Sequence, residues 1–237
     1  MKFRPKPPKA INRVVLPFDG RDDGMAADSV FSPSRPGDIS IVGEIFRKLI
    51  HLGAIAIPII YYFLDKQTIL TLLSLGLIFS LMLDYIRVFG NEGSKRFVHE
   101  YLGIMIRSKE SKDFIGATYI LTGSIITISL FDKSIAMAGI AFIVVGDTAG
   151  AIIGRLWGRV RFRNKSLEGS VSFFLACCVI SFIIPGIPYW ILVIGALTAT
   201  IVEALTFHID DNLIVPVTSA AMMQVIVSQM IIIKYFS

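Results

Sequence analysis

The sequence predicts an all-α membrane protein that crosses the bilayer about seven times. Of its 237 residues, 54% are hydrophobic and only 17% are charged, which is too apolar for an ordinary soluble domain. The apolar residues also form seven long runs, and a helix needs roughly 20 apolar residues to cross about 30 Å of hydrocarbon. No segment of about ten residues alternates with period two, so membrane-barrel strands are not expected. The predicted spans are residues 45–64, 69–88, 114–131, 134–156, 169–186, 189–207 and 213–234.

The distribution of Lys and Arg predicts the orientation of these spans. Residues 1–48 hold nine of these cations, residues 87–113 hold six and residues 155–165 hold five, whereas the other connections hold only Lys66, Lys133 and Lys234. By the positive-inside rule, the N-terminus and the polar connections are cytoplasmic and the C-terminus is outside. The net charge of +5 follows from this topology, and no nucleic-acid partner is expected.

Two parts of the chain are predicted from composition. Residues 1–43 carry six of the ten prolines and seven Lys or Arg residues, which indicates a flexible cytoplasmic arm without a core of its own. Residues 44–237 hold the predicted spans and are expected to form one membrane-embedded domain, which would also carry any catalytic site. Within it, residues 91–112 are amphipathic and are expected to lie along the inner interface as a linker.

Ionisable residues in the first two spans need an explanation, because each costs roughly 2.5–3.5 kcal/mol at the centre of a spanning helix unless it is paired or hydrated. Glu44, Arg47, Lys48 and His51 share one helical face. Snorkelling cations and an ion pair explain three of them, while His51 lies one turn deeper and can transfer protons near pH 7. Asp84 and Arg87 form an i,i+3 pair for which a structural and a functional role are equally open.

The stretch from residue 146 to residue 170 is the most unusual in the chain. Gly146, Gly150, Gly154 and Gly158 recur every four residues, a spacing typical of close helix packing. Packing alone does not require the carboxylate of Asp147, which is suited to Mg²⁺ bound together with phosphates. The following cations either neutralise a polyphosphate or set the topology: Arg155, Arg159, Arg161, Arg163 and Lys165.

A second acidic group follows the sixth span. Glu203 lies near the inner end of its helix, and helix capping does not explain it. Asp210, Asp211 and Asn212 form an acidic turn that also suits the start of the next helix. No P-loop, Rossmann, HExxH or G-x-S-x-G motif occurs, so a nucleotide enzyme here is not of those types.

Together these pieces resemble the CTP-dependent polyprenol and lipid kinases, the family of dolichol kinase, phytol kinase and CTP-dependent diacylglycerol kinase. The resemblance covers residues 44–216 in the order of the family. The matching motifs are ExxRKxxH at 44–51, GDTAGAIIGRLWG at 146–158, KSLEGS at 165–170 and VEAL…DDNLIVP at 202–216.

The resemblance implies a cytoplasmic CTP site and transfer of the γ-phosphate to the hydroxyl of a membrane lipid alcohol. Mg²⁺ or another divalent cation is expected on Asp147 and Asp211, and the catalytic residues expected are Asp147, Glu203 and His51. Arg47, Lys48 and Asn212 are expected to contact substrate or phosphate. The residues expected to bind the nucleotide are Gly146, Gly150, Gly154, Arg155, Lys165, Ser166, Glu168, Gly169 and Ser170.

The acceptor and the reaction leave alternatives. A polyprenol or dolichol-type isoprenoid is the first expectation for the acceptor, and diacylglycerol is the second. A lipid cytidylyltransferase of the phosphatidate type would also combine CTP and a membrane lipid, but it would release pyrophosphate. A membrane transporter is the non-enzyme alternative, although its polar groups should continue to the outer side. The sequence predicts no oligomeric state.

Overall fold

The computed structural model describes residues 51–91, 93, 114–162, 165–205 and 209–236. The arm over residues 1–43 lies outside this range, as does most of the linker predicted over residues 91–112. The described chain contains seven α-helices, one 3-10 turn and one small hairpin. The elements are η2 (Gly53–Ile55), α2 (Ala56–Phe63), α3 (Lys66–Phe89), α5 (Gly116–Leu130), α6 (Lys133–Trp157), β1 (Arg161–Phe162), β2 (Lys165–Ser166), α7 (Leu167–Ser181), α8 (Tyr189–Leu205) and α9 (Asp211–Phe236).

The all-α class is therefore confirmed, and each predicted apolar run overlaps one of these helices. The sequence analysis did not anticipate the hairpin. β1 and β2 pair antiparallel, with Arg161 opposite Ser166 and Phe162 opposite Lys165. The hairpin joins α6 to α7 and thus occupies the basic stretch that follows the glycine repeat.

Polar side chains and one glycine fix where helices begin and where the chain turns. Asp65 caps α3, since its carboxylate accepts a hydrogen bond from the Thr68 backbone N–H at 3.0 Å. Ser166 caps α7 in the same way through the Gly169 N–H, at 3.1 Å. Between α7 and α8, Gly186 adopts a φ of 80°, a conformation that residues with a β-carbon rarely adopt.

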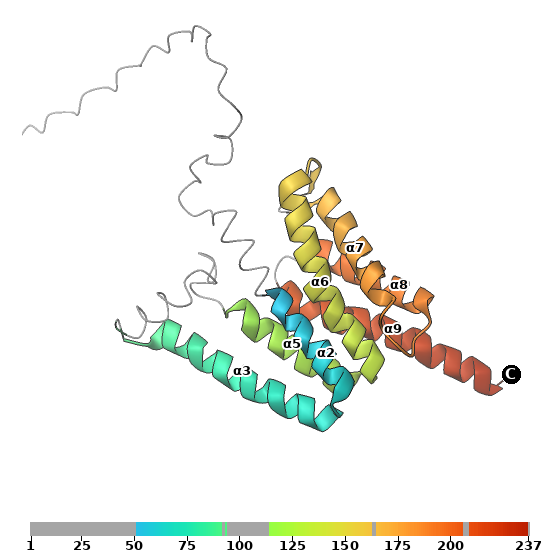
Figure 1. Cartoon of the computed structure of the whole chain (residues 1–237), viewed down its shortest axis with the longest axis horizontal. Helices are drawn as coiled ribbons and strands as arrows, with labels where there is room; N and C mark the ends of the chain where they lie inside the picture. Colours follow the sequence, from blue (N-terminus) through green and yellow to red (C-terminus); the bar gives the residue numbers. More distant parts are fainter. Residues whose placement is uncertain (1–50, 92, 94–113, 163–164, 206–208, 237) are drawn as a thin grey trace, which may run out of the picture. The chain divides into compact units, whose positions relative to one another are not determined.

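Helix α6 lies at the centre of the fold, in contact with α2, α5, α7, α8 and α9 (Figure 1). It is buried over most of its length, and the largest core cluster forms around its residues Ile135, Ala138 and Phe142. Gly139 lets α6 and α9 cross closely, because a β-carbon at this position would lie 2.7 Å from the Pro216 carbonyl oxygen. α3 lies at the edge of the bundle, where it packs on α5 and α2.

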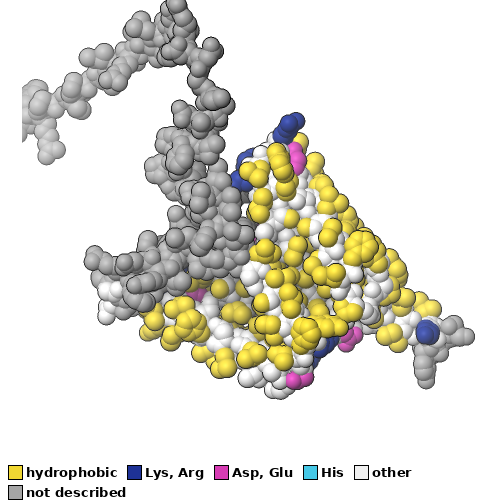
Figure 2. All heavy atoms as spheres, viewed as in Figure 1, with side chains coloured by type: hydrophobic (Ala, Val, Ile, Leu, Met, Phe, Trp, Pro, Cys, Tyr) yellow, Lys and Arg dark blue, Asp and Glu magenta, His cyan; other side chains and the backbone are white. Residues whose placement is uncertain are grey.

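The outer surface of the described helices is largely hydrophobic. Figure 2 shows apolar side chains over most of one face, with the charged side chains mainly at its ends. Leu75, Ile78 and Phe79 of α3 are 58–65% exposed, which is unfavourable in water and favourable in lipid. These surfaces and the apolar helices identify a membrane protein.

Helix length supports a full membrane crossing for three of the seven helices. α3, α6 and residues 211–234 of α9 have 24, 25 and 24 residues. α5, α7 and α8 have 15, 15 and 17 residues, or about 23–26 Å at 1.5 Å per residue, less than the hydrocarbon thickness. The seven-span topology and the positions of the termini therefore remain predictions.

The connections gather at two ends of the bundle, as alternating helices require. At one end, Lys66 Nζ donates to the Ser129 carbonyl at 2.8 Å and Lys133 Nζ donates to the Leu64 carbonyl at 2.9 Å. At the other end, Asp84 accepts hydrogen bonds from Thr118 Oγ1 at 2.7 Å and from Arg87 Nη2 at 2.9 Å. Asp84 also accepts from the Ile115 N–H at the start of α5, so the Asp84–Arg87 pair joins α3 to α5.

Candidate active site

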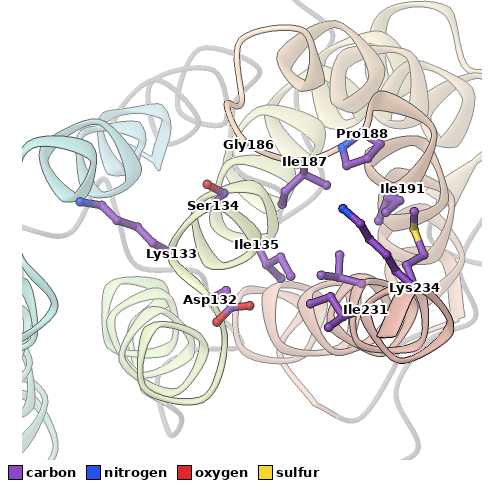
Figure 3. Close-up of a pocket in the computed structure, with 12 residues that line it drawn as sticks. Asp132, Lys133, Ser134, Ile135, Gly186, Ile187, Pro188, Ile191, Ile231 and Lys234 are labelled. Carbon is purple, nitrogen blue, oxygen red and sulfur yellow. The ribbon is translucent and has the colours of Figure 1, made fainter. Parts of the chain in front are cut away.

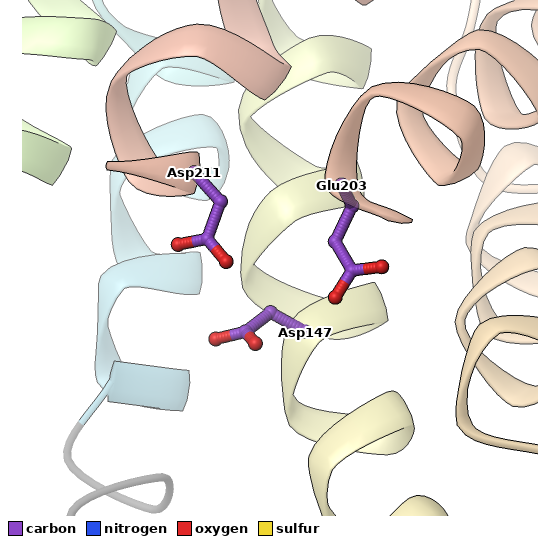
Figure 4. Close-up of side chains that lie close together, drawn as sticks. All are labelled: Asp147, Glu203 and Asp211. Atoms are coloured by element: carbon purple, nitrogen blue, oxygen red, sulfur yellow. The ribbon is translucent and has the colours of Figure 1, made fainter. Parts of the chain in front are cut away.

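Three carboxylates from three helices converge near the second end of the bundle. Asp147 comes from the C-terminal half of α6, Glu203 from the last turn of α8 and Asp211 from the first residue of α9. One oxygen from each lies within 4.8 Å of the others, and the side chains point toward one another (Figure 4). The structure thus brings together the acidic residues that the sequence predicted as the chemical site.

Lys165 supplies the cation of this cluster from strand β2. Its ammonium forms an ion pair with Glu203 Oε1, lies 3.4 Å from Asp211 Oδ2 and donates to the Glu203 carbonyl oxygen at 2.6 Å. Burial acts to lower the pKa of Lys165, but the carboxylates of Asp211 and Glu203 outweigh it and hold that pKa above its usual value. The carboxylates therefore favour the charged form of Lys165.

His51 lies on the other side of Asp147. Its Nε2 is 3.6 Å from Asp147 Oδ2, and both side chains are largely buried, at 10% and 14% exposure. The sequence analysis named both as catalytic candidates from separate motifs, and the fold places them in contact. Arg47 and Lys48, from the same motif as His51, lie outside the described residues, as does His208.

The cluster fits a divalent cation held by oxygen ligands. Three carboxylates facing one another repel unless a cation compensates them, and a single ammonium leaves a surplus of negative charge. Glu203 Oε2 is buried and accepts no hydrogen bond within the described part of the chain. A buried carboxylate oxygen without a donor is costly, and a hard cation such as Mg²⁺ is the partner it suits.

Asp210 and Asn212 flank Asp211 and have different surroundings. Burial, with a further contribution from Asp211, raises the pKa of Asp210 to about 6, and its Oδ1 accepts from the Asn212 N–H at 3.0 Å. Asn212 is buried, and its Nδ2 lies near Gly116 at the start of α5. Its buried Oδ1 accepts no hydrogen bond from the described residues, and its contact with substrate remains a prediction.

The glycines of the repeat line the contact between α6 and α7. A β-carbon at Gly146 would lie 2.7 Å from the Phe173 ring, and one at Gly150 would lie 3.0 Å from the Gly169 carbonyl oxygen. At Gly154 the nearest atom would be Ser166 Oγ, at 2.7 Å. Close helix packing therefore accounts for these glycines, and their predicted contact with the nucleotide stays a prediction.

The KSLEGS stretch divides between the cluster and the hairpin. Lys165 reaches the carboxylates, whereas Ser166 and Gly169 are buried against α6. Glu168 Oε1 accepts hydrogen bonds from the Arg159 and Val160 N–H groups at 3.0 and 3.1 Å, so this carboxylate holds the base of the hairpin. Ser170 is half-buried in the first turn of α7, and Arg155 is exposed at the end of α6.

A cavity lies at the opposite end of α6, α8 and α9 from the carboxylates. It encloses about 370 Å³ between the start of α6, the turn before α8 and the end of α9. Ile187, Ile191 and Ile231 make it mainly apolar, and Lys133 points away from Lys234 in Figure 3. The one carboxylate among its lining residues, Asp132, is hydrogen-bonded to Gln224, so the cavity lacks the converging carboxylates of the acidic cluster.

The fold and the cluster together define a helical membrane protein with a buried carboxylate–lysine site. The chain is 27% identical over 222 residues to CTP-dependent diacylglycerol kinase 1 of Eremothecium gossypii, covering 81% of this chain and 70% of that protein. It is 26% identical over 204 residues to the protein of the same name in Schizosaccharomyces pombe, covering 77% and 93%. An uncharacterized protein of Rickettsia prowazekii is 29% identical over 182 residues, covering 73% and 89%.

These similarities, at 26–27% identity over most of the chain, support the CTP-dependent lipid kinase family that the sequence motifs resemble. The chain matches no protein-family model and no solved structure.

Proposed function

We propose that this protein is a CTP-dependent diacylglycerol kinase that transfers the γ-phosphate of CTP to the free hydroxyl of the lipid. The observation that carries the proposal is the convergence of Asp147, Glu203 and Asp211 around one lysine, in a chain similar to CTP-dependent lipid kinases. The positive-inside pattern supports placing this site at the cytoplasmic face, where CTP is available.

Asp147, Glu203 and Asp211 would hold a divalent cation. When bound, that cation supplies neutralisation of the negative charge on the phosphates of CTP, the main requirement of phosphoryl transfer. The unpaired Glu203 Oε2 supports the inclusion of Glu203 as a ligand beside the two aspartates predicted from the sequence.

Lys165 would exchange its partners when the nucleotide binds. In this structure its ammonium compensates Glu203 and Asp211. With a divalent cation on these carboxylates, the same ammonium is released to bind a phosphate oxygen as a point charge. Its position at the edge of the cluster, 28% exposed, allows this movement.

His51 is the better candidate for the general base. Lys165 holds one oxygen of Glu203, which weakens Glu203 as a proton acceptor, whereas His51 lies beside Asp147 at 3.6 Å. In the proposed step, the oxygen of the lipid hydroxyl forms a bond to the γ-phosphorus and its proton passes to His51. The bond between the γ-phosphorus and the β–γ bridging oxygen breaks, and CDP leaves.

Diacylglycerol takes precedence over a polyprenol as the acceptor because the named relatives are diacylglycerol kinases. Both lipids present one hydroxyl at the interface, so apolar helices discriminate between them poorly. A polyprenol of the dolichol type was the first expectation from the sequence, and it remains the alternative to be tested alongside.

The proposal is tested by incubating the purified protein with CTP, Mg²⁺ and a panel of acceptors in mixed micelles: diacylglycerol, dolichol and phytol. We expect phosphatidate from diacylglycerol, and no product from the Asp147→Asn variant, which loses a charged ligand at almost unchanged volume. The thermal unfolding of that variant in detergent checks that it folds. Near-normal turnover by Asp147→Asn would refute the role of the cluster.

A further inference from the structure

We propose that Phe162 stacks against the cytosine ring of CTP and thereby supplies much of the affinity for the nucleotide. The inference rests on the proposed function only in that CTP is the phosphoryl donor. It assigns a role to a residue of the β1–β2 hairpin that no motif of the sequence analysis included.

The pairing of the hairpin places Phe162 beside the lysine of the site. Phe162 lies directly opposite Lys165 in the antiparallel ladder. Side chains of directly opposed residues emerge on the same face, roughly 5 Å apart at their β-carbons. Lys165 extends from that face to Glu203 and Asp211, so the Phe162 ring emerges from the hairpin face that serves the carboxylates.

Hydrogen bonds hold the base of the hairpin, and they thereby hold the strand that carries Phe162. The Leu167 N–H donates to the Val160 carbonyl at 2.9 Å, and Glu168 Oε1 accepts from the backbone N–H groups of Arg159 and Val160. Ser166, next to Lys165, is buried against Gly154 and Gly158 of α6. The backbone on both sides of the hairpin is therefore held against the end of α6 and the start of α7.

Exposure and chemistry favour a planar aromatic ligand at Phe162. Its side chain is 59% exposed, and Phe162 stands opposite the lysine that reaches the carboxylates. A nucleotide has phosphates at one end and a planar base at the other. A lysine suits the phosphates, and an aromatic ring on the same face of the hairpin suits the base. Trp157, at the end of α6, is similarly exposed at 64% but lies outside the strand pairing with Lys165. It is the matched control.

The test measures binding without the lipid acceptor. Equilibrium dialysis in detergent with Mg²⁺ gives the dissociation constants for CTP and for inorganic tripolyphosphate, which has the phosphates but no base. Removal of an aromatic stacking partner weakens binding of a base roughly 5- to 150-fold. We expect Phe162→Ala to weaken CTP binding within that range and to leave tripolyphosphate binding unchanged. Phe162→Tyr and Trp157→Ala should stay within about twofold of the unmodified protein.

Each other outcome overturns the inference in a recognisable way. Equal weakening of CTP and tripolyphosphate by Phe162→Ala means that the substitution disturbs Lys165 and not a base contact. Unchanged CTP binding, with a higher KM only for the lipid, means that Phe162 anchors the hairpin in the membrane. If the unmodified protein binds no CTP, the proposed function fails as well; if it binds CTP and Phe162→Ala binds equally well, only this inference fails.

Discussion

Replacing Lys165 by Met tests whether its ammonium stands in for a divalent cation among the carboxylates. Met keeps an unbranched side chain of similar length and removes the charge. Lys165 Nζ lies 3.4 Å from Asp211 Oδ2, and at an effective dielectric constant near 20 that pair attracts by about 5 kcal/mol. Desolvation offsets part of this attraction, so we take about 3 kcal/mol, the lower value for breaking a buried pair, as the cost of losing Lys165.

Two opposite effects on metal binding should follow from the substitution. Without nucleotide, Mn²⁺ no longer competes with the ammonium for the carboxylates. If half of the 3 kcal/mol is gained as binding free energy, Mn²⁺ binds the variant at least about tenfold more tightly. With CTP present, the variant lacks a phosphate ligand, so turnover should fall by at least about 100-fold, as for loss of a charged hydrogen bond worth about 3 kcal/mol.

The assay combines Mn²⁺ titration, followed by electron paramagnetic resonance, with thermal unfolding in detergent. Lys165→Met should unfold at a lower temperature without metal and regain stability as Mn²⁺ is added. Lys133→Met is the matched control, since Lys133 donates to the Leu64 carbonyl at the other end of the bundle. Weaker Mn²⁺ binding by Lys165→Met in the absence of CTP would refute the reasoning.

Two further substitutions test the packing that holds the site. Gly154→Ala places a β-carbon 2.7 Å from Ser166 Oγ and 3.3 Å from Gly169 Cα, which should lower the free energy of unfolding by about 1–3 kcal/mol. Thermal unfolding measures the effect, and Gly53→Ala is the control because a β-carbon there would meet no described atom within 4 Å. Equal melting temperatures for the two variants would contradict the prediction. Asp84→Asn keeps the size of the side chain but removes the charge that pairs with Arg87, and it should cost about 2–3 kcal/mol in chemical denaturation. Denaturation unchanged from the unmodified protein would mean that the link between α3 and α5 contributes little.

The helices and the acidic residues of the site could be predicted from the sequence because their signals are local. Each apolar run overlaps a helix, and Asp147, Glu203 and Asp211 were conspicuous as carboxylates inside apolar runs or next to them. The structure brings these three together. The helix ends were less well predicted: α7 ends at Ser181, before the end of the run at residue 186, because the turn around Gly186 interrupts it.

Contacts between distant segments could not be predicted in this way. The pairing of Lys165 with Glu203 and Asp211 joins residues 38 and 46 positions apart and depends on the arrangement of three helices. The glycine repeat could serve packing or phosphate binding until Phe173, Ser166 and Gly169 were seen against it. The hairpin did leave a signal: apolar and basic residues alternate from Arg159 to Phe162, the period of a strand.

The fate of the phosphates of CTP tests the central claim most directly. The purified protein is incubated with diacylglycerol, Mg²⁺ and CTP that carries radioactive phosphorus at either the γ- or the α-position. The account predicts labelled phosphatidate only from γ-labelled CTP, with CDP as the other product. Label in the lipid from α-labelled CTP, together with release of pyrophosphate, would contradict it and identify a cytidylyltransferase.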